Sequence, residues 1–225
     1  MAWGTKNVRA VIFDMDGVII DSEPFHYIVN KKLFADLGIN FTLKDNGNFI
    51  GVSNKDMYGL YKRKYALKHS LKKLCDMQME KFLEYLMKSR QKPIPGIVTL
   101  LKTLKKNKIK IALASSSNYK NINGVLAKFR IKKYFNAIVS AENMKHSKPD
   151  PAIFLKTARL LCVKPGDCLV IEDAQHGIQA ARSAGMKSIG FQNPNSGKQD
   201  LSKADLIVRK IKNITLKGIN RIYFD

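Results

Sequence analysis

Two carboxylates stand two residues apart near the start of the chain, directly after an apolar run. Asp14 and Asp16 follow Val11-Ile12-Phe13 and are followed by Gly17. Such a run is typical of a buried strand, and ligands of open α/β sheets bind at the carboxyl ends of strands. Carboxylates this close repel each other unless a cation or a shared proton relieves them. The spacing therefore predicts a hard metal ion such as Mg²⁺, which takes oxygen ligands and also binds phosphate.

A calcium-binding loop also begins with closely spaced aspartates, but the rest of its pattern is missing here. In an EF-hand loop the glycine is the sixth residue of an acidic run. Gly17 is the fourth residue counted from Asp14, and the apolar segment Val18-Ile19-Ile20 follows it. A calcium loop of that type is excluded.

Hydroxyl groups follow a second apolar run. Residues 110–114 lead into Ser115-Ser116-Ser117-Asn118. Hydroxyls and backbone N–H groups at a strand end, just ahead of a helix, suit a phosphate group. The same tetrapeptide is also typical of a turn and a helix cap, so this segment alone does not predict a binding site.

A lysine and a second acidic pair follow two more runs. Lys148 precedes Pro149 in the segment after residues 137–139, and Glu172-Asp173 follows residues 168–171. The second pair repeats the metal-ligand chemistry of Asp14 and Asp16, again where a strand is expected to end.

The elements that must position these groups alternate along the chain. Helical patterns separate short β-branched runs, which predicts a parallel sheet covered by helices on both faces. We expect strands at Val8–Phe13, Lys110–Ala114, Ala137–Val139, Cys168–Ile171, Ser188–Phe191 and Leu206–Val208, and helices at Gly96–Lys106, Lys120–Lys128, Pro151–Leu161 and His176–Ala184.

The segment 22–92 interrupts this alternation. Its apolar residues recur at helical spacing and it contains no convincing strand. The Pro93-Ile94-Pro95-Gly96 segment ends it, because proline disfavours helix at the preceding residue. We expect a helical insert at 22–92 and a main domain formed by 1–21 and 93–225.

Composition is that of a globular domain with a substantial core. The chain has 225 residues, of which 45% are apolar, and no apolar run is long enough to span a membrane. Its N-terminus lacks the apolar stretch of a signal peptide. Its 3 cysteines have no Cys-x-x-Cys spacing, which argues against a disulfide framework and a zinc site. We therefore expect a cytoplasmic protein, and we expect it to be a monomer.

The formal net charge of +22 raises the possibility of a nucleic-acid partner. The lysines are spread over the whole chain, however, and asparagine and isoleucine are also frequent. This favours a general compositional bias and a solvated, anion-attracting surface. Specific nucleic-acid binding is not expected, and a non-catalytic basic binding module is the third of our three functional hypotheses.

The polar groups occur in the order acid pair, hydroxyl, lysine, acid pair, and this order resembles the four motifs of the haloacid dehalogenase superfamily of phosphotransferases. Phe13–Val18 fits the first motif, Ser115 the second, Lys148-Pro149 the third and Glu172-Asp173 the fourth. The helical insert is similar to the α-helical cap of the subgroup containing β-phosphoglucomutase and many small-metabolite phosphatases. Gly51-Val52-Ser53 and the segment 21–26 also resemble that subgroup. The resemblance implies a Rossmann-like parallel sheet core with a small α-helical cap.

The resemblance also implies roles for the core residues. Asp14 would be the nucleophile that forms an aspartyl-phosphate, and Asp16 would act as general acid and then as general base. Ser115 and Lys148 would hold phosphate oxygens. Mg²⁺ would be bound by Asp14, by the backbone carbonyl of Asp16 and by Asp173, with Glu172 as a further ligand or a supporting group.

Substrate contacts are expected from the cap and from the loop after the second strand. In the family, the histidine that corresponds to His26 helps to couple cap closure to proton transfer. The other expected substrate contacts are Gly51, Val52, Ser53, Asn54, Ser116, Ser117 and Asn118.

We therefore predict a Mg²⁺-dependent phosphatase of a small phosphorylated metabolite, with a sugar phosphate as the expected class. The alternative is a β-phosphoglucomutase, an isomerase with the same core. In that enzyme an arginine follows Gly-Val-Ser, where this chain has Asn54, and a cap lysine falls near Met77. Lys55 or Lys81 could take over the missing charge.

Overall fold

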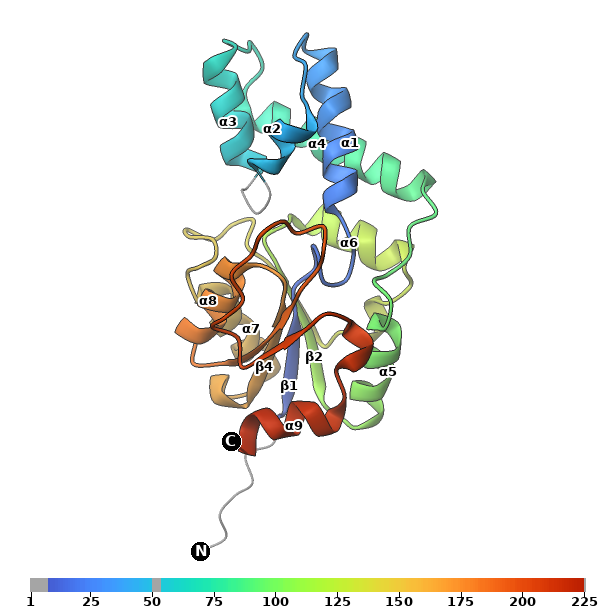
Figure 1. Cartoon of the computed structure of the whole chain (residues 1–225), viewed down its shortest axis with the longest axis vertical. Coiled ribbons are helices and arrows are strands. Elements are labelled where there is room, and N and C mark those ends of the chain that lie inside the picture. The colour runs from blue at the N-terminus through green and yellow to red at the C-terminus, as the bar shows by residue number, and fades with distance from the viewer. Residues whose placement is uncertain (1–7, 50–53, 225) are drawn as a thin grey trace, which may run out of the picture.

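Six parallel strands form one sheet in the order β3-β2-β1-β4-β5-β6 (Figure 1). The structure, a computed structural model, describes residues 8–49 and 54–224. The strands are β1 (Ala10–Phe13), β2 (Lys110–Ser115), β3 (Ala137–Ser140), β4 (Cys168–Glu172), β5 (Lys187–Phe191) and β6 (Leu206–Val208). The predicted parallel α/β sheet is confirmed.

The central strand brings the two acidic pairs together. From β1 the chain continues to β2 on one side and reaches β4 on the other, which makes β1 and β4 the switch point of the sheet. Phe13 lies level with Leu113 on β2 and with Ile171 on β4. One residue further along, Asp14 and Glu172 therefore meet at the carboxyl edge.

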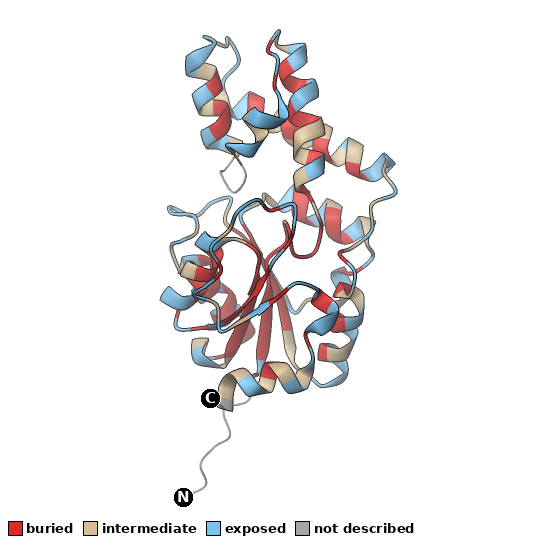
Figure 2. Ribbon diagram, in the orientation of Figure 1, coloured by how far each residue is buried: buried red, intermediate tan, exposed pale blue. Residues whose placement is uncertain are grey.

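Successive residues of the strands face opposite helical layers. Val11 and Phe13 belong to a cluster with residues of α5, α6 and α9, whereas Ala10 and Ile12 pack with residues of α7 and α8. Figure 2 shows the strands as the most continuously buried part of the chain. The helices of the two layers are α5 (Ile97–Lys106), α6 (Tyr119–Lys128), α7 (Ala152–Leu161), α8 (Gln175–Ser183) and α9 (Leu216–Phe224).

Of the five described helices between β1 and β2 in the sequence, the first four lie beyond the carboxyl edge of the sheet (Figure 1). They have an aromatic cluster of their own, in which the ring of Phe34 stacks on Phe41 and lies beside Tyr58 and Tyr61. We call these helices the cap; the exact limits 22 and 92 stay a prediction. The cap helices are α1 (Glu23–Asp36), α2 (Leu43–Gly47), α3 (Asn54–Lys64) and α4 (Leu71–Lys88).

The cap is anchored to the core at the near ends of α1 and α4. Phe25 of α1 and Phe82 and Leu86 of α4 belong to the main hydrophobic cluster of the core, not to the cap's own cluster. Lys128 at the end of α6 donates to the carbonyl oxygens of Met87 and Ser89, at 2.8 Å and 2.7 Å. These contacts satisfy carbonyl groups at the C-terminus of α4, which have no partner within the helix.

Two elements differ from the sequence prediction. The first strand begins at Ala10 instead of Val8, because its neighbours start level with Ala10, at Lys110 and Cys168. Helix α9 was not predicted; its Ile219 is buried in the main hydrophobic cluster, which fixes the helix on the core.

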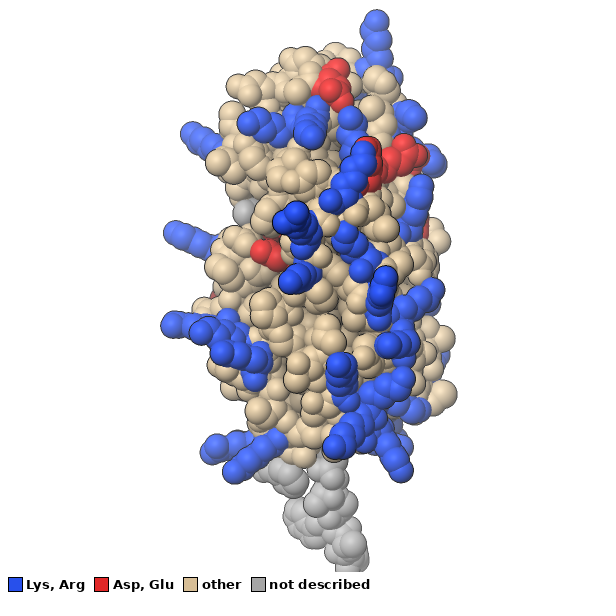
Figure 3. Space-filling model, turned by 90° about the vertical axis from the view of Figure 1, so that its right-hand side faces the viewer, with Lys and Arg blue, Asp and Glu red and all other residues tan. Residues whose placement is uncertain are grey.

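Basic side chains extend over the whole height of the face shown in Figure 3, from the cap to the far end of the core. Such a distribution agrees with the scattered lysines of the sequence. Among the helices of the described residues, none is both long and apolar enough to cross a bilayer.

Candidate active site

The site begins at the loop after β1, which turns at the carboxyl edge of the sheet. The backbone N–H of Asp14 donates to the Ile171 carbonyl at 3.0 Å and extends the ladder between β1 and β4. Gly17 then adopts a φ of 77° and donates to the Ile20 carbonyl at 2.8 Å. This tight turn directs Asp14 and Asp16 to different neighbours.

Three carboxylates converge at the switch point. Oxygen atoms of Asp14, Glu172 and Asp173 lie within 4.8 Å of one another, and all three residues are buried. Lys148 brings its ammonium group to this acidic cluster, 2.5 Å from Asp14 Oδ1 and 3.2 Å from Glu172 Oε1. The structure thus brings together Asp14 and Glu172, which are 158 positions apart in the sequence.

The acidic cluster has three carboxylates and only one ammonium group, and this excess of acidic groups shifts the pKa values of its members. Burial and the neighbouring carboxylate of Glu172 raise the pKa of Asp14 to about 8, although Lys148 lowers it. Burial and the charges of Glu172 and Asp14 also raise the pKa of Asp173 well above its ordinary value. Burial disfavours the charged form of Lys148, but the carboxylates of Asp14 and Glu172 outweigh this and raise its pKa.

The residues present fit a divalent cation. One lysine compensates one of the three buried carboxylates, and two negative charges would remain without a further cation. The donors are carboxylate oxygens, which Mg²⁺ prefers. A Cβ on Gly17 would run into the Asp173 carboxylate, so the glycine leaves the room that this side chain occupies.

Asp16 faces a different set of groups. Its Oδ2 accepts hydrogen bonds from Ser117 Oγ at 2.8 Å and from Ser115 Oγ at 3.5 Å. Its Oδ1 lies 3.9 Å from Nε2 of His26 and has no hydrogen-bond partner among the described residues. The carboxylate of Asp16 is therefore outside the acidic cluster, and any contribution to the metal site would come from its backbone carbonyl.

Asp16 and His26 shift each other's pKa in opposite directions. Burial by itself raises the pKa of Asp16, but the imidazole of His26 and the hydroxyl of Ser117 hold it below the ordinary value. Burial lowers the pKa of His26, but Asp16 outweighs this effect and raises it. The two carboxylates of the first motif thus have pKa values shifted in opposite directions, and a cation bound at the acidic cluster would lower that of Asp14.

The residues of the segment 115–118 differ in burial and in their contacts. Ser115 is fully buried and Ser117 contacts Asp16, as described above. Ser116 is exposed. Asn118 is the N-cap of α6 and accepts from the backbone N–H of Asn121 at 2.9 Å, which is the helix-cap role that its sequence context also allowed.

The structure describes two of the substrate contacts predicted on the cap, His26 and Asn54. His26 lies near Asp16, and its Nδ1 is 3.1 Å from Nε2 of Gln78. Asn54 donates to Oε1 of Gln78 at 3.0 Å. Gly51, Val52 and Ser53 lie outside the described residues.

Residues that the sequence analysis missed complete the site. Ser196 donates a short hydrogen bond to Asp173 Oδ2, and Asn193 donates to the Gly17 carbonyl at 2.9 Å. Both follow β5, so the reasoning applied to the other strand ends could have found them. Gln78 sits within a helix, and nothing in its local sequence indicates its position.

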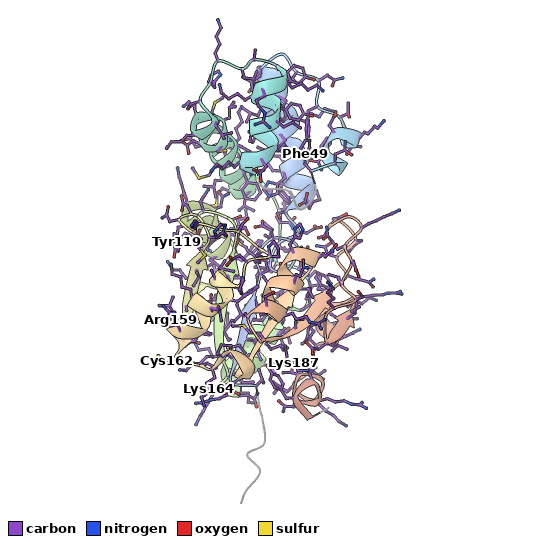
Figure 4. The ribbon with its side chains drawn as sticks, turned by 90° about the vertical axis from the view of Figure 1, so that its left-hand side faces the viewer. Phe49, Tyr119, Arg159, Cys162, Lys164 and Lys187 are labelled. Atoms are coloured by element: carbon purple, nitrogen blue, oxygen red, sulfur yellow. The ribbon has the colours of Figure 1, made fainter. Side chains whose placement is uncertain are left out.

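The residues labelled in Figure 4 lie on facing ends of the cap and the core or at the far end of the core. Figure 4 shows Phe49 on the cap and Tyr119 on the core, at the ends of the two parts that face each other. Arg159, Cys162, Lys164 and Lys187 gather at the opposite end of the core, away from the site (Figure 4).

The profile of a protein family described as haloacid dehalogenase-like hydrolase matches residues 11–191. The chain belongs to this family. The predicted enzyme class, a phosphoric monoester hydrolase of the haloacid dehalogenase superfamily, is confirmed at the level of the family. Likewise, the predicted haloacid dehalogenase-like fold is confirmed.

Individual haloacid dehalogenase relatives differ in the reaction that their names describe. The chain is 38% identical to β-phosphoglucomutase of Bacillus subtilis (strain 168), over 93% of each chain. It is 31% identical to a phosphorylated carbohydrates phosphatase of Thermotoga maritima, over 81% of this chain and 84% of the relative. Among solved structures, β-phosphoglucomutase of Clostridium difficile superposes with a TM-score of 0.81 at 33% identity, over 96% of this chain and 97% of the other.

Replacing Gly17 by alanine should damage the site beyond the strain of its backbone. The variant Gly17→Ala must accommodate both a positive φ, which costs about 1–2 kcal/mol, and a methyl group at the Asp173 carboxylate. Gly185→Ala is a matched control, because Gly185 has a φ of 70° and open space around its Cβ position. Urea unfolding should show a larger loss for Gly17→Ala. Equal losses in the two variants would mean that the contact with Asp173 does not matter.

Proposed function

We propose that this protein is a Mg²⁺-dependent phosphatase that hydrolyses a small phosphorylated metabolite, with a sugar phosphate as the substrate class. One observation carries the proposal. Asp14 lies in a buried acidic cluster with Lys148, while Asp16, two residues on, is directed to Ser117 and His26. A nucleophile and a separately placed proton donor and acceptor are the two groups that hydrolysis through a covalent intermediate requires.

In the first step, a carboxylate oxygen of Asp14 attacks the phosphorus atom and the bond to the leaving oxygen breaks. Asp16 gives its proton to that oxygen, so the alcohol leaves neutral. Lys148 holds a phosphate oxygen close to Asp14, and Ser115 contributes its hydroxyl on the opposite side. In the second step, Asp16 takes a proton from a water molecule, whose oxygen then displaces Asp14 from the phosphorus.

Asp14, Glu172, Asp173 and the backbone carbonyl of Asp16 would hold the magnesium ion. When bound, it would neutralise the charge of the carboxylates and the phosphate together. The raised pKa values of Asp14 and Asp173 support this assignment, because a cation would keep both groups ionised at neutral pH.

The second candidate is a β-phosphoglucomutase, which the relatives of that name in Bacillus subtilis and Clostridium difficile favour. Such a mutase has to hold a bisphosphorylated sugar at both ends. Asn54 is neutral and hydrogen-bonded to Gln78, and Lys81 is ion-paired with Asp36 at 2.8 Å, at the distal end of α1. Both features favour hydrolysis over the mutase reaction. Lys55, exposed on α3, is the remaining substitute that we considered.

Cellular context and partners follow from the same proposal. The three cysteines are all free, which suits a reducing cytoplasm. A monomer remains our expectation. A nucleic-acid-binding module is disfavoured, because such a module has no use for a buried nucleophile with an acid two residues on.

Asp14→Asn should abolish turnover, because a neutral amide does not attack phosphorus. We expect phosphate release below about one-hundredth of the wild-type rate in a folded protein. Asp36→Asn is the matched control, since it removes only an ion pair at the surface. Residual activity above that level, with contamination excluded, contradicts the covalent mechanism.

Removal of divalent ions should stop phosphate release, and added Mg²⁺ should restore it. Asp173→Asn should raise the Mg²⁺ concentration needed for half-maximal activity by about tenfold or more. Asp76→Asn, which breaks a surface ion pair with Lys72, should leave that concentration unchanged. Full activity in excess chelator would remove the role assigned to the acidic cluster.

Phosphate release and sugar isomerisation, measured on the same substrates, distinguish a hydrolase from a mutase. We expect phosphate release from several sugar monophosphates, and little conversion of β-glucose 1-phosphate to glucose 6-phosphate when glucose 1,6-bisphosphate is supplied. The mutase has an arginine after Gly-Val-Ser where this chain has Asn54, and an asparagine does not replace the charge or bidentate geometry of that arginine. Both products are measured in the same reaction. Isomerisation that outruns hydrolysis would establish the mutase.

A further inference from the structure

Three cap helices contribute to one partly buried chain of polar side chains that ends at the core. Asn54 of α3 donates to Oε1 of Gln78 on α4, and Nε2 of Gln78 is 3.1 Å from Nδ1 of His26 on α1. Nε2 of His26 faces Oδ1 of Asp16 at 3.9 Å. Gln78 is 1% exposed, so water does not replace its partners.

We propose that Gln78 is a positioning residue that holds His26 with its proton on Nε2, directed at Asp16. The hydrogen bond from Asn54 occupies the oxygen of the Gln78 amide and leaves its NH₂ group facing the imidazole. An amide NH₂ is a donor only, so Nδ1 of His26 must accept. In a neutral imidazole the proton is then on Nε2.

Helix α4 also fixes the plane of the ring. Phe82 lies one turn after Gln78, and residues at this spacing share a helix face. The His26 ring stacks on Phe82 with centroids 4.8 Å apart and an angle of 18° between the planes. Gln78 therefore sets the direction in which the stacked ring points, while Phe82 sets its tilt.

A hydrogen-bond donor on Nε2 of His26 suits the carboxylate of Asp16. Its Oδ2 is occupied by Ser117, whereas its Oδ1 is buried without a hydrogen-bond partner among the described residues. The Nε2–H group of His26 is directed at this free oxygen. Gln78 thus acts on Asp16 through His26 and does not contact the substrate. The effect of Gln78 on catalysis rests on the phosphatase activity proposed above.

The first arm of the test does not depend on activity. Nitrogen-15 NMR of the imidazole distinguishes the protonated ring nitrogen from the unprotonated one, at a pH where the ring is neutral. In the wild type we expect the proton of His26 on Nε2. Gln78→Glu replaces the donor by an acceptor of the same shape and should move a proton to Nδ1, and Gln78→Leu should give a mixture.

The second arm uses the leaving group. If His26 acts on the acid, Gln78→Leu should lower kcat for an alkyl phosphate by about tenfold and change kcat for nitrophenyl phosphate by less than about threefold, since a good leaving group needs little proton transfer. Tyr58→Phe is the control. It removes a buried cap hydrogen bond to Asn30 that does not involve Gln78 or His26, and should move neither readout.

Several results would overturn the inference. A proton on Nδ1 in the wild type would mean that both amides are turned over, with the oxygen of Gln78 facing the ring. An unchanged His26 spectrum in Gln78→Glu, or equal losses with the two substrates, would leave Gln78 a packing residue. If Gln78→Leu does not fold, Asn54→Ala tests the same chain by releasing the Gln78 amide. Absence of phosphatase activity with the expected tautomer would refute the proposed function and retain the positioning role.

Discussion

The structure depends on the burial of three carboxylates around one ammonium group. Asp14, Glu172 and Asp173 are drawn together at the carboxyl edge of the sheet, where Lys148 bridges the first two. Buried charges of one sign are unfavourable without compensation, so the free energy gained elsewhere in the fold has to hold them in place. Hydrophobic packing on both faces of the sheet supplies that free energy. The strands β1 and β4, at whose carboxyl ends Asp14 and Glu172 stand, are fully buried.

This arrangement explains why the site contains small residues and hydroxyls next to its charges. Gly17 makes room for Asp173, and a Cβ on Gly177 would occupy the place of the Glu172 side chain. Ser196 donates to Asp173 from the loop after β5. The carboxylates thus keep close packing and partial hydrogen bonding, while their net negative charge remains available to a cation.

The cap lies on the side of the site where Asp16 faces His26. Its own aromatic cluster makes it a packed unit, and the anchoring residues Phe25, Phe82 and Leu86 join it to the core. The polar chain through Gln78 then reaches Asp16 by way of His26. The cap thus provides shape and hydrogen bonding, while the ion-paired Lys148 and the acidic cluster belong to the core. This division agrees with a family in which relatives with similar cores carry names of different reactions.

The sequence by itself determined the sheet, the helical insert and the core motifs. Hydrophobic periodicity is a local property, so strands such as Lys110–Ser115 were predicted to within one residue. The acids, the serine and the lysine could be found because each follows a strand, and parallel strands end at the same edge. Their roles came from the family resemblance, and family membership is now shown.

Only the tertiary structure decided which neighbours each group has. It separated Asp16 from the acidic cluster, made Asn118 a helix cap, and placed Gln78 against His26 from a position 52 residues away. Helix α9 and Ser196 also escaped prediction, because their contacts lie on other elements of the core. Periodicity specifies which face of an element is buried, but the partner of a buried polar atom depends on how elements pack, and that is decided by the whole chain.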